Sequence, residues 1–168
     1  MRVRLVLICL VLFLAGCGYA LQVENRFPDG IEAVFVEPVH NRTVQPFLET
    51  LLFRHYAREL AAQPGIALVD DRATADAVIE SVIRKYKRRN SAYRGDDEVA
   101  EYSVSIEVVA GLRRQKDGVL IWQRELSWSS EFLADPSLEV QENRETATVE
   151  EVCHQLAKKL VSELLAAF

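Results

Sequence analysis

The stretch Ala100-Glu-Tyr-Ser-Val-Ser-Ile-Glu-Val-Val-Ala-Gly-Leu-Arg113 alternates apolar and polar side chains over most of its length. A period of two places the two sets on opposite faces of a β-strand, so we predict one buried face and one that meets water or a partner. The run Gln115-Lys-Asp-Gly118 then supplies the Asp-Gly pair of a hairpin turn. The returning strand should carry its large apolar residues on one face, which Arg124 interrupts: Leu120, Trp122, Leu126 and Trp128.

Two other segments have helical periodicity. Apolar residues recur at spacings of three and four within 46–63, and again in one stripe from about Asn143 to Phe168. Further strands are predicted at 31–36, 66–69 and 77–88, which gives the order β-α-β-β-β-β-α. Two amphipathic helices need a shared apolar surface. The predicted fold class is therefore α+β, with both helices packed on one face of a mostly antiparallel, roughly four-stranded sheet.

The N-terminus has the features of an export signal. Arg2 and Arg4 precede an apolar run, 5–14, that is too short to span a membrane, since a spanning helix needs about 20 apolar residues. The next four residues, Leu14-Ala-Gly-Cys17, resemble the bacterial lipobox, in which the cysteine sulfur takes a diacylglyceryl group. We predict cleavage before Cys17 and lipidation of that residue. An ordinary signal peptide with a chance cysteine is the alternative.

This N-terminus divides the chain into a signal peptide (1–16), a lipidated tether (17–30) and one domain (31–168). Gly18 is not the aspartate that retains enteric lipoproteins at the inner membrane, so the predicted location is the periplasmic face of the outer membrane. Removing the signal leaves 152 residues with 18 Lys and Arg against 25 Asp and Glu, a net charge of −7. An acidic chain of this size has enough residues for one core and argues against nucleic acid as a partner.

Cysteine usage is consistent with an exported protein. Cys9 leaves with the signal and Cys17 is lipidated, so Cys153 has no cysteine with which to form an intramolecular disulfide. Cys153 falls on the apolar face of the second predicted helix. There we expect it to act as a small buried hydrophobe rather than as a reactive thiol.

Several short motifs carry a resemblance to one family. They are Cys17-Gly-Tyr-Ala-Leu21, Ile31 to Val36, Pro38-Val-His-Asn-Arg-Thr43, Pro46-Phe-Leu-Glu49 and Ala75-Asp-Ala77. In this order, with a hairpin and a C-terminal helix after them, the chain resembles the LPS-assembly lipoprotein family (LptE). The resemblance implies two helices on a four-stranded sheet and a role without catalysis. Such a lipoprotein sits inside the outer-membrane LPS translocon β-barrel, helps it to assemble and contacts lipopolysaccharide.

Basic residues form a dense cluster, Arg84-Lys-Tyr-Lys-Arg-Arg89, followed by Arg94. A guanidinium can bind two phosphate oxygens at once, which suits an anionic ligand such as LPS. The alternative is a solvated strand that charge protects from aggregation. Alternation divides the cluster between the two faces of the strand: Lys85, Lys87 and Arg89 on one, Arg84 and Arg88 on the other.

A second basic group lies beside the hairpin turn: Arg113, Arg114 and Lys116. We treat both groups as candidate LPS or anion contacts. Whether they lie at the same end of the sheet depends on strand topology, which the sequence leaves open.

Signals for catalysis, metals and cofactors were sought and none was found. His40, His55 and His154 lie in different segments without metal-ligand spacing, and no nucleophile elbow or phosphate loop is present. The acidic pairs at 70–71 and 96–98 are typical of solvated turns. We therefore expect no enzyme, no metal and no cofactor.

Three functions remain. The first is an LPS-translocon partner, the second a lipoprotein of another lipid-transport or secretion system, and the third, disfavoured for want of a nucleophile, a periplasmic hydrolase.

Overall fold

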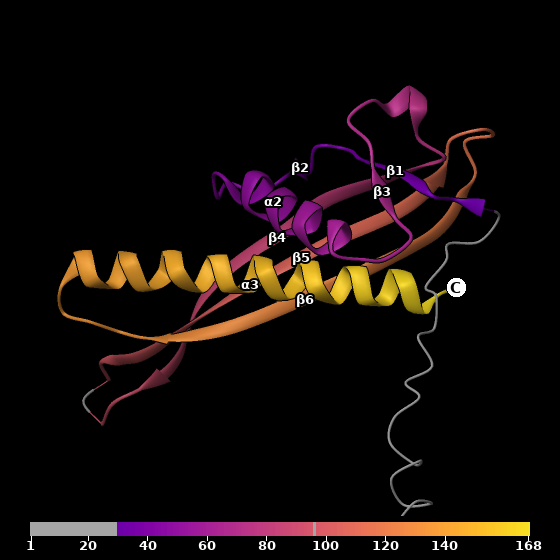
Figure 1. Cartoon of the computed structure of the whole chain (residues 1–168). Helices are drawn as coiled ribbons and strands as arrows, with labels where there is room; N and C mark the ends of the chain where they lie inside the picture. Colours follow the sequence, from indigo (N-terminus) through magenta and orange to yellow (C-terminus); the bar gives the residue numbers. More distant parts are fainter. Residues whose placement is uncertain (1–29, 96) are drawn as a thin grey trace, which may run out of the picture.

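The computed structural model describes residues 30–95 and 97–168 (Figure 1). The predicted signal peptide, the lipidation of Cys17 and all but the last residue of the tether lie outside the described residues. The described elements are β1 (Ala33–Val36), β2 (His40–Asn41), α2 (Leu48–Ala61), β3 (Ala67–Leu68), the 3-10 turn η2 (Arg72–Thr74), β4 (Ala77–Tyr93), β5 (Val99–Arg114), β6 (Leu120–Leu133) and α3 (Leu138–Ala166).

The sheet has six strands and is mixed, so the prediction of a roughly four-stranded, mostly antiparallel sheet is wrong in its count and in part of its pairing. Its order is β3-β1-β4-β5-β6, and β2 also pairs with β4. The strands β4, β5 and β6 are antiparallel, whereas β1 pairs in parallel with both β3 and β4. The parallel pairs arise because α2 carries the chain back before it re-enters the sheet, as a helical crossover does.

Both helices lie on one face of the sheet, as predicted (Figure 1). On β5 the even-numbered side chains from Val104 to Leu112 are buried, and they form one core with the apolar stripes of α2 and α3. At the hairpin turn Gly118 has φ +69°, a conformation that glycine adopts readily. The alternation of β5 and the Asp-Gly turn therefore predicted the centre of the fold.

The predicted start of α3 lies too far along the chain. The helix begins at Leu138 rather than near Asn143, and its first turns run beyond the start of α2 (Figure 1). Because these turns reach past the core, the residues from Leu138 to Val140 are exposed and carry no apolar stripe. Periodicity detects a helix only where one of its faces is buried.

A histidine pair lies between the two helices. His55 on α2 is 5% exposed, and neither of its ring nitrogens has a hydrogen-bond partner among the described residues. Its ring centroid lies 5.2 Å from that of His154 on α3. Burial lowers the pKa of His55, and the nearby His154 and Arg54 lower it further, while Glu150 opposes them.

This pair should make folding sensitive to mild acid. With a folded pKa below the ordinary value of 6.5, neutral His55 contributes stability that is complete above about pH 6.5 and is lost as the pH falls through the folded pKa. We expect the free energy of unfolding in urea to fall by about 1–2 kcal/mol between pH 7 and pH 5. His55→Gln should remove most of this loss, and His40→Gln, an exposed control, should not. An equal loss in wild type and His55→Gln would contradict the assignment.

Candidate functional site

The sheet has an open face, which we define as the side away from α2 and α3. Since even-numbered residues of β5 face the helices, odd-numbered ones point to the open face. Cross-strand pairing extends this face over β4 and β6, where three rows of side chains cross it: Lys85–Glu107–Ser127, Lys87–Ser105–Ser129 and Arg89–Ser103–Glu131. Cations, hydroxyls and carboxylates thus share one surface that no helix covers.

The predicted division of the first basic cluster is confirmed for four of its residues. Lys85, Lys87 and Arg89 lie on the open face, and Arg88 lies opposite Val104 on the helix-facing side. Arg84 has no cross-strand partner because the register shifts between Ile83 and Lys85. Such an irregularity leaves one extra residue on a strand and bends it locally.

Lys85 is neutralised within the sheet. Its ammonium group donates to both carboxylate oxygens of Glu107, each at 2.9 Å. This contact raises the pKa of Lys85 and lowers the pKa of Glu107. Lys85 is exposed and Glu107 is partly exposed, so solvent screens the ion pair and it adds little to stability. Its effect is to cancel one of the cations on the open face.

Arg88 is engaged by α3. Its Nε lies 2.9 Å from a carboxylate oxygen of Glu145, and its guanidinium carbon lies 4.0 Å from the centre of the Tyr102 ring. The hydroxyl of Tyr86 donates to the same carboxylate at 2.9 Å, and burial together with this bond raises the pKa of Tyr86. Arg88 therefore joins the long hairpin to α3, and this role withdraws it from ligand binding.

Three cations of the first basic cluster have no carboxylate partner among the described residues. The side chains of Arg84, Lys87 and Arg89 make no hydrogen bond or ion pair with another side chain in the part of the chain that the structure describes. Lys87 and Arg89 are two positions apart on β4, about 7 Å along the strand. With the hydroxyls of Ser103 and Ser105 beside them, they can bind anionic oxygens. Arg94 lies beyond them, 3.9 Å from Glu98.

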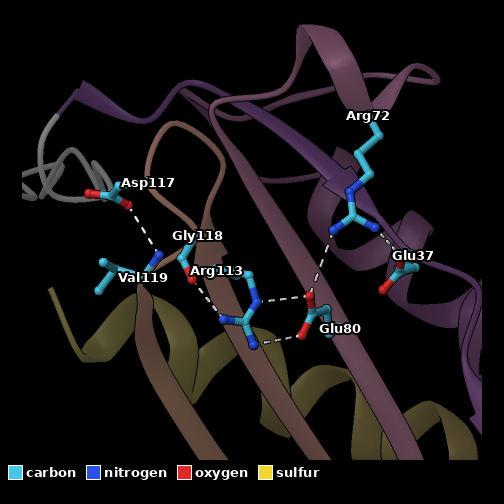
Figure 2. A network of polar contacts seen from close by, with 7 residues as sticks. All are labelled: Glu37, Arg72, Glu80, Arg113, Asp117, Gly118 and Val119. Carbon is cyan, nitrogen blue, oxygen red and sulfur yellow. Dashed lines mark hydrogen bonds and ion pairs between the residues drawn. The ribbon is translucent and has the colours of Figure 1, made fainter.

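The second basic group is tied into the fold (Figure 2). Arg113 donates to both carboxylate oxygens of Glu80, at 3.0 and 3.3 Å, and to the Gly118 carbonyl at 2.7 Å. Arg72 reaches the same Glu80 and also pairs with Glu37, as Figure 2 shows. These contacts fasten η2, β1, β4 and the hairpin turn to one another and raise the pKa of Arg113.

The two basic groups lie far apart. Arg113 is opposite Val78 near the start of β4, whereas Arg89 comes eleven residues later on the same strand, which is about 36 Å at strand spacing. Arg114 pairs with Asp117 at 3.1 Å, and Lys116 is exposed in the turn. We therefore place the candidate site on Arg84, Lys87 and Arg89 alone. The sequence could not separate these residues from the rest, because their neighbours find carboxylates on distant segments.

The apolar face predicted for β6 is buried only in part. Trp122 and Leu126 are buried, while Leu120 and Trp128 are 40% and 38% exposed. The strand forms an edge of the sheet, so its side chains have a neighbouring strand on one side only. Arg124 is exposed opposite Ala110, and its guanidinium donates to the Gln123 carbonyl at 3.0 Å. It is not a buried charge.

Cys153 and possible metal ligands are the other candidates for chemistry among the described residues. Cys153 is fully buried, and burial raises the pKa of its thiol to about 12, so it packs as a hydrophobe as predicted. Residues 30–95 and 97–168 contain no group of three His, Cys, Asp or Glu side chains placed to hold a metal. None of the helices described is long and apolar enough to span a membrane.

Comparison with known proteins assigns the family. The model of the LptE family, described as lipopolysaccharide-assembly, matches residues 31–164. The chain belongs to this family. Among curated protein sequences no match was found.

Three solved structures illustrate the similarity in fold. An uncharacterized lipoprotein B from Nitrosomonas europaea is 14% identical, with a TM-score of 0.59 over 89% of this chain and 88% of that one. The rare lipoprotein B from Shewanella oneidensis is 13% identical, with a TM-score of 0.55 over 79% and 95%. A hypothetical protein from Chlamydia trachomatis is 14% identical, with a TM-score of 0.60 over 80% and 96%. At these identities the likeness to LptE-family lipoproteins is one of fold.

Arg88 is bound within the fold and Arg89 is not, and the free energies of unfolding of alanine variants test this difference. Arg88→Ala should lower the free energy of unfolding by about 1–2 kcal/mol, because it removes a charged hydrogen bond and a cation–π contact. Arg89→Ala, a matched loss of charge on the open face, should change it by less than about 0.5 kcal/mol. Urea unfolding at pH 7 measures both. Equal losses would show that Arg89 is also engaged within the fold.

Proposed function

We propose that this protein is an outer-membrane lipoprotein that partners the β-barrel of the LPS translocon, assists the assembly of that barrel and helps to deliver LPS to the cell surface. It has no enzymatic activity in this proposal. Membership of the LptE family supports the role, and the lipobox ending at Cys17 supports lipid anchoring. The domain then acts from the periplasmic side or within the barrel.

The observation that carries the proposal is a set of three cations on β4 that are unpaired among the described residues, Arg84, Lys87 and Arg89, of which Lys87 and Arg89 lie on the open face. Phosphate groups give LPS its negative charge, and Arg84 and Arg89 each offer a planar guanidinium that can bind two phosphate oxygens. Lys87 adds a point charge between them, and Ser103 and Ser105 add hydroxyls. In a chain with a net excess of acid, these three cations lie close together on one strand, and Lys87 and Arg89 lie on a surface that no helix covers.

The position of these cations suits a ligand that leaves the anchoring membrane. The described domain begins at Gly30, at the end of the sheet that carries the β5–β6 turn, and the β4–β5 hairpin projects from the opposite end (Figure 1). Asp76 fixes the entry end: its carboxylate accepts the backbone N–H groups of Glu32 and Ala33 at 3.0 and 2.8 Å, and its carbonyl accepts that of Gln115 at 2.8 Å. The cations therefore lie along the half of the sheet that is away from Gly30.

Co-purification tests the partner. The lipidated protein, recovered in mild detergent from its own envelope at wild-type expression, should bring a stoichiometric large β-barrel that survives washing and that mass spectrometry identifies as the translocon. Recovery of soluble partners alone would support the alternative, a component of another lipid-transport or secretion system. Recovery of no partner would remove the translocon proposal.

Binding of LPS tests the site. The double substitution Lys87→Ala with Arg89→Ala should weaken LPS binding by about 10- to 100-fold, since each charged hydrogen bond contributes about 1.5–3 kcal/mol and water replaces part of it. Purified protein and LPS in detergent, followed by fluorescence titration, give the affinity.

The matched control is Lys116→Ala with Arg94→Ala, which removes two positive charges elsewhere. It should leave the affinity within about twofold at moderate salt, because exposed charges beyond a Debye length are screened. If both pairs weaken binding equally, only net charge matters and the open face is not a site.

A further inference from the structure

The loop between β2 and α2 is held rigid by its own side chains. The amide of Asn41 donates to the Gln45 carbonyl at 2.8 Å and to Glu49 at 2.8 Å. Its amide oxygen accepts from the backbone N–H and the hydroxyl of Thr43, at 2.9 and 2.8 Å. A turn built this way fixes the direction in which the next residues point.

This rigid loop presents two large apolar side chains to solvent. Val44 is 100% exposed and Phe47 is 70% exposed. A flexible loop can fold such residues back onto the core, but this loop is pinned at both ends. Exposed apolar side chains that are gathered together mark contact sites more often than scattered ones do.

Phe47 also holds a strained backbone. Its φ is +65° and its ψ is 0°, the left-handed conformation that a bulky residue disfavours and glycine accepts readily. Its side chain is mostly in water, so burial in the free protein offsets little of this cost. Strain of this kind persists where the surrounding structure imposes it, and it is concentrated at functional sites.

A groove lies beside Phe47, with a volume of about 410 Å³. Its apolar lining comes from Pro46, Phe47 and Leu51 at the start of α2 and from Val149 on α3. Toward the start of α3 the residues that line the groove are polar: Thr146, Glu145 and Glu142. The apolar lining is therefore limited to the start of α2 and Val149.

One edge of this groove is acidic. Glu142 lines it, and Glu139 lies one turn earlier on the same helix. Neither carboxylate has a cationic partner among the described residues, whereas Glu145, which also lines the groove, is already paired with Arg88. An occupant that places an apolar side chain in the groove is therefore favoured if a basic side chain lies next to it.

We propose that the groove formed by Pro46, Phe47, Leu51 and Val149 docks a segment of a partner protein that carries an apolar side chain beside a lysine or arginine. The inference rests on the proposed function, in which that partner is the translocon barrel. It assigns the barrel contact to the helix side of the molecule and leaves the open face of the sheet to the anionic ligand.

Phe47→Gly separates docking from folding. Glycine relieves the left-handed strain and removes the aromatic side chain, so the variant should melt no lower than wild type while recovery of the barrel falls at least fivefold in the co-purification. Glu142→Lys should reduce recovery at an unchanged melting temperature. Val119→Ala, an exposed apolar residue in the hairpin turn, is the matched control and should keep wild-type recovery.

Each outcome decides the docking proposal. Wild-type recovery by Phe47→Gly would overturn it while leaving the proposed function intact. No recovery of the barrel by the wild-type protein would overturn both. If Phe47→Gly proves unstable, Phe47→Asn, which tolerates the same backbone conformation, replaces it, and a loss of recovery without a loss of stability is again required.

Discussion

Burial of one face of β5 beneath α2 and α3 is the interaction on which the rest of the structure depends. The even-numbered side chains of β5 meet both helices, and the strands on either side of it, β4 and β6, take their register from this central strand. A shift of one residue would exchange the buried and exposed sets, so the register is strongly fixed. With both helices on one side, the opposite side of the sheet is left open, and polar residues occupy most of its far half.

Ion pairs then determine where positive charge remains available. The basic residues near the hairpin turn are matched by Glu80 and Asp117, and Arg88 is matched by Glu145 on α3. These contacts hold the ends of a long, narrow sheet to the segments around them. Within the first basic cluster the cations that remain, Arg84, Lys87 and Arg89, lie close together on β4. In a protein with a net negative charge this placement concentrates positive potential locally, which is the property that the proposed binding of an anionic glycolipid uses.

The sequence predicted the features that depend on local periodicity and missed those that depend on topology. The alternation of β5 and the Asp-Gly turn were sufficient for the hairpin, and alternation alone placed Lys85, Lys87 and Arg89 on one face. The strands β1 and β3 were predicted, at 31–36 and 66–69, but their parallel pairing depends on the crossover through α2 and was not. The strand β2 was missed because its two residues are too few to show a period. The partners of the basic residues were missed for a related reason: Glu145 is far from Arg88 in sequence, and only the packing of α3 brings them together.

The same limit applies to the loop before α2. Its Asn-Arg-Thr sequence contributed only to the family resemblance, and no local pattern predicted the left-handed backbone of Phe47 or the groove that forms between α2 and α3. Two surfaces on opposite sides of the sheet result, one cationic and one apolar with an acidic edge. They differ in chemistry, so one molecule can hold a lipid ligand and a protein partner at the same time.

The account is tested most directly by mapping backbone amide shifts by NMR while LPS is added to the lipidated protein in detergent micelles. It predicts that the largest shifts fall on β4 at 84–89 and on the facing parts of β5 and β6, at 103–107 and 127–131, with little change in α2, α3 or the hairpin turn. Shifts concentrated in the helices or at 113–118 would contradict it.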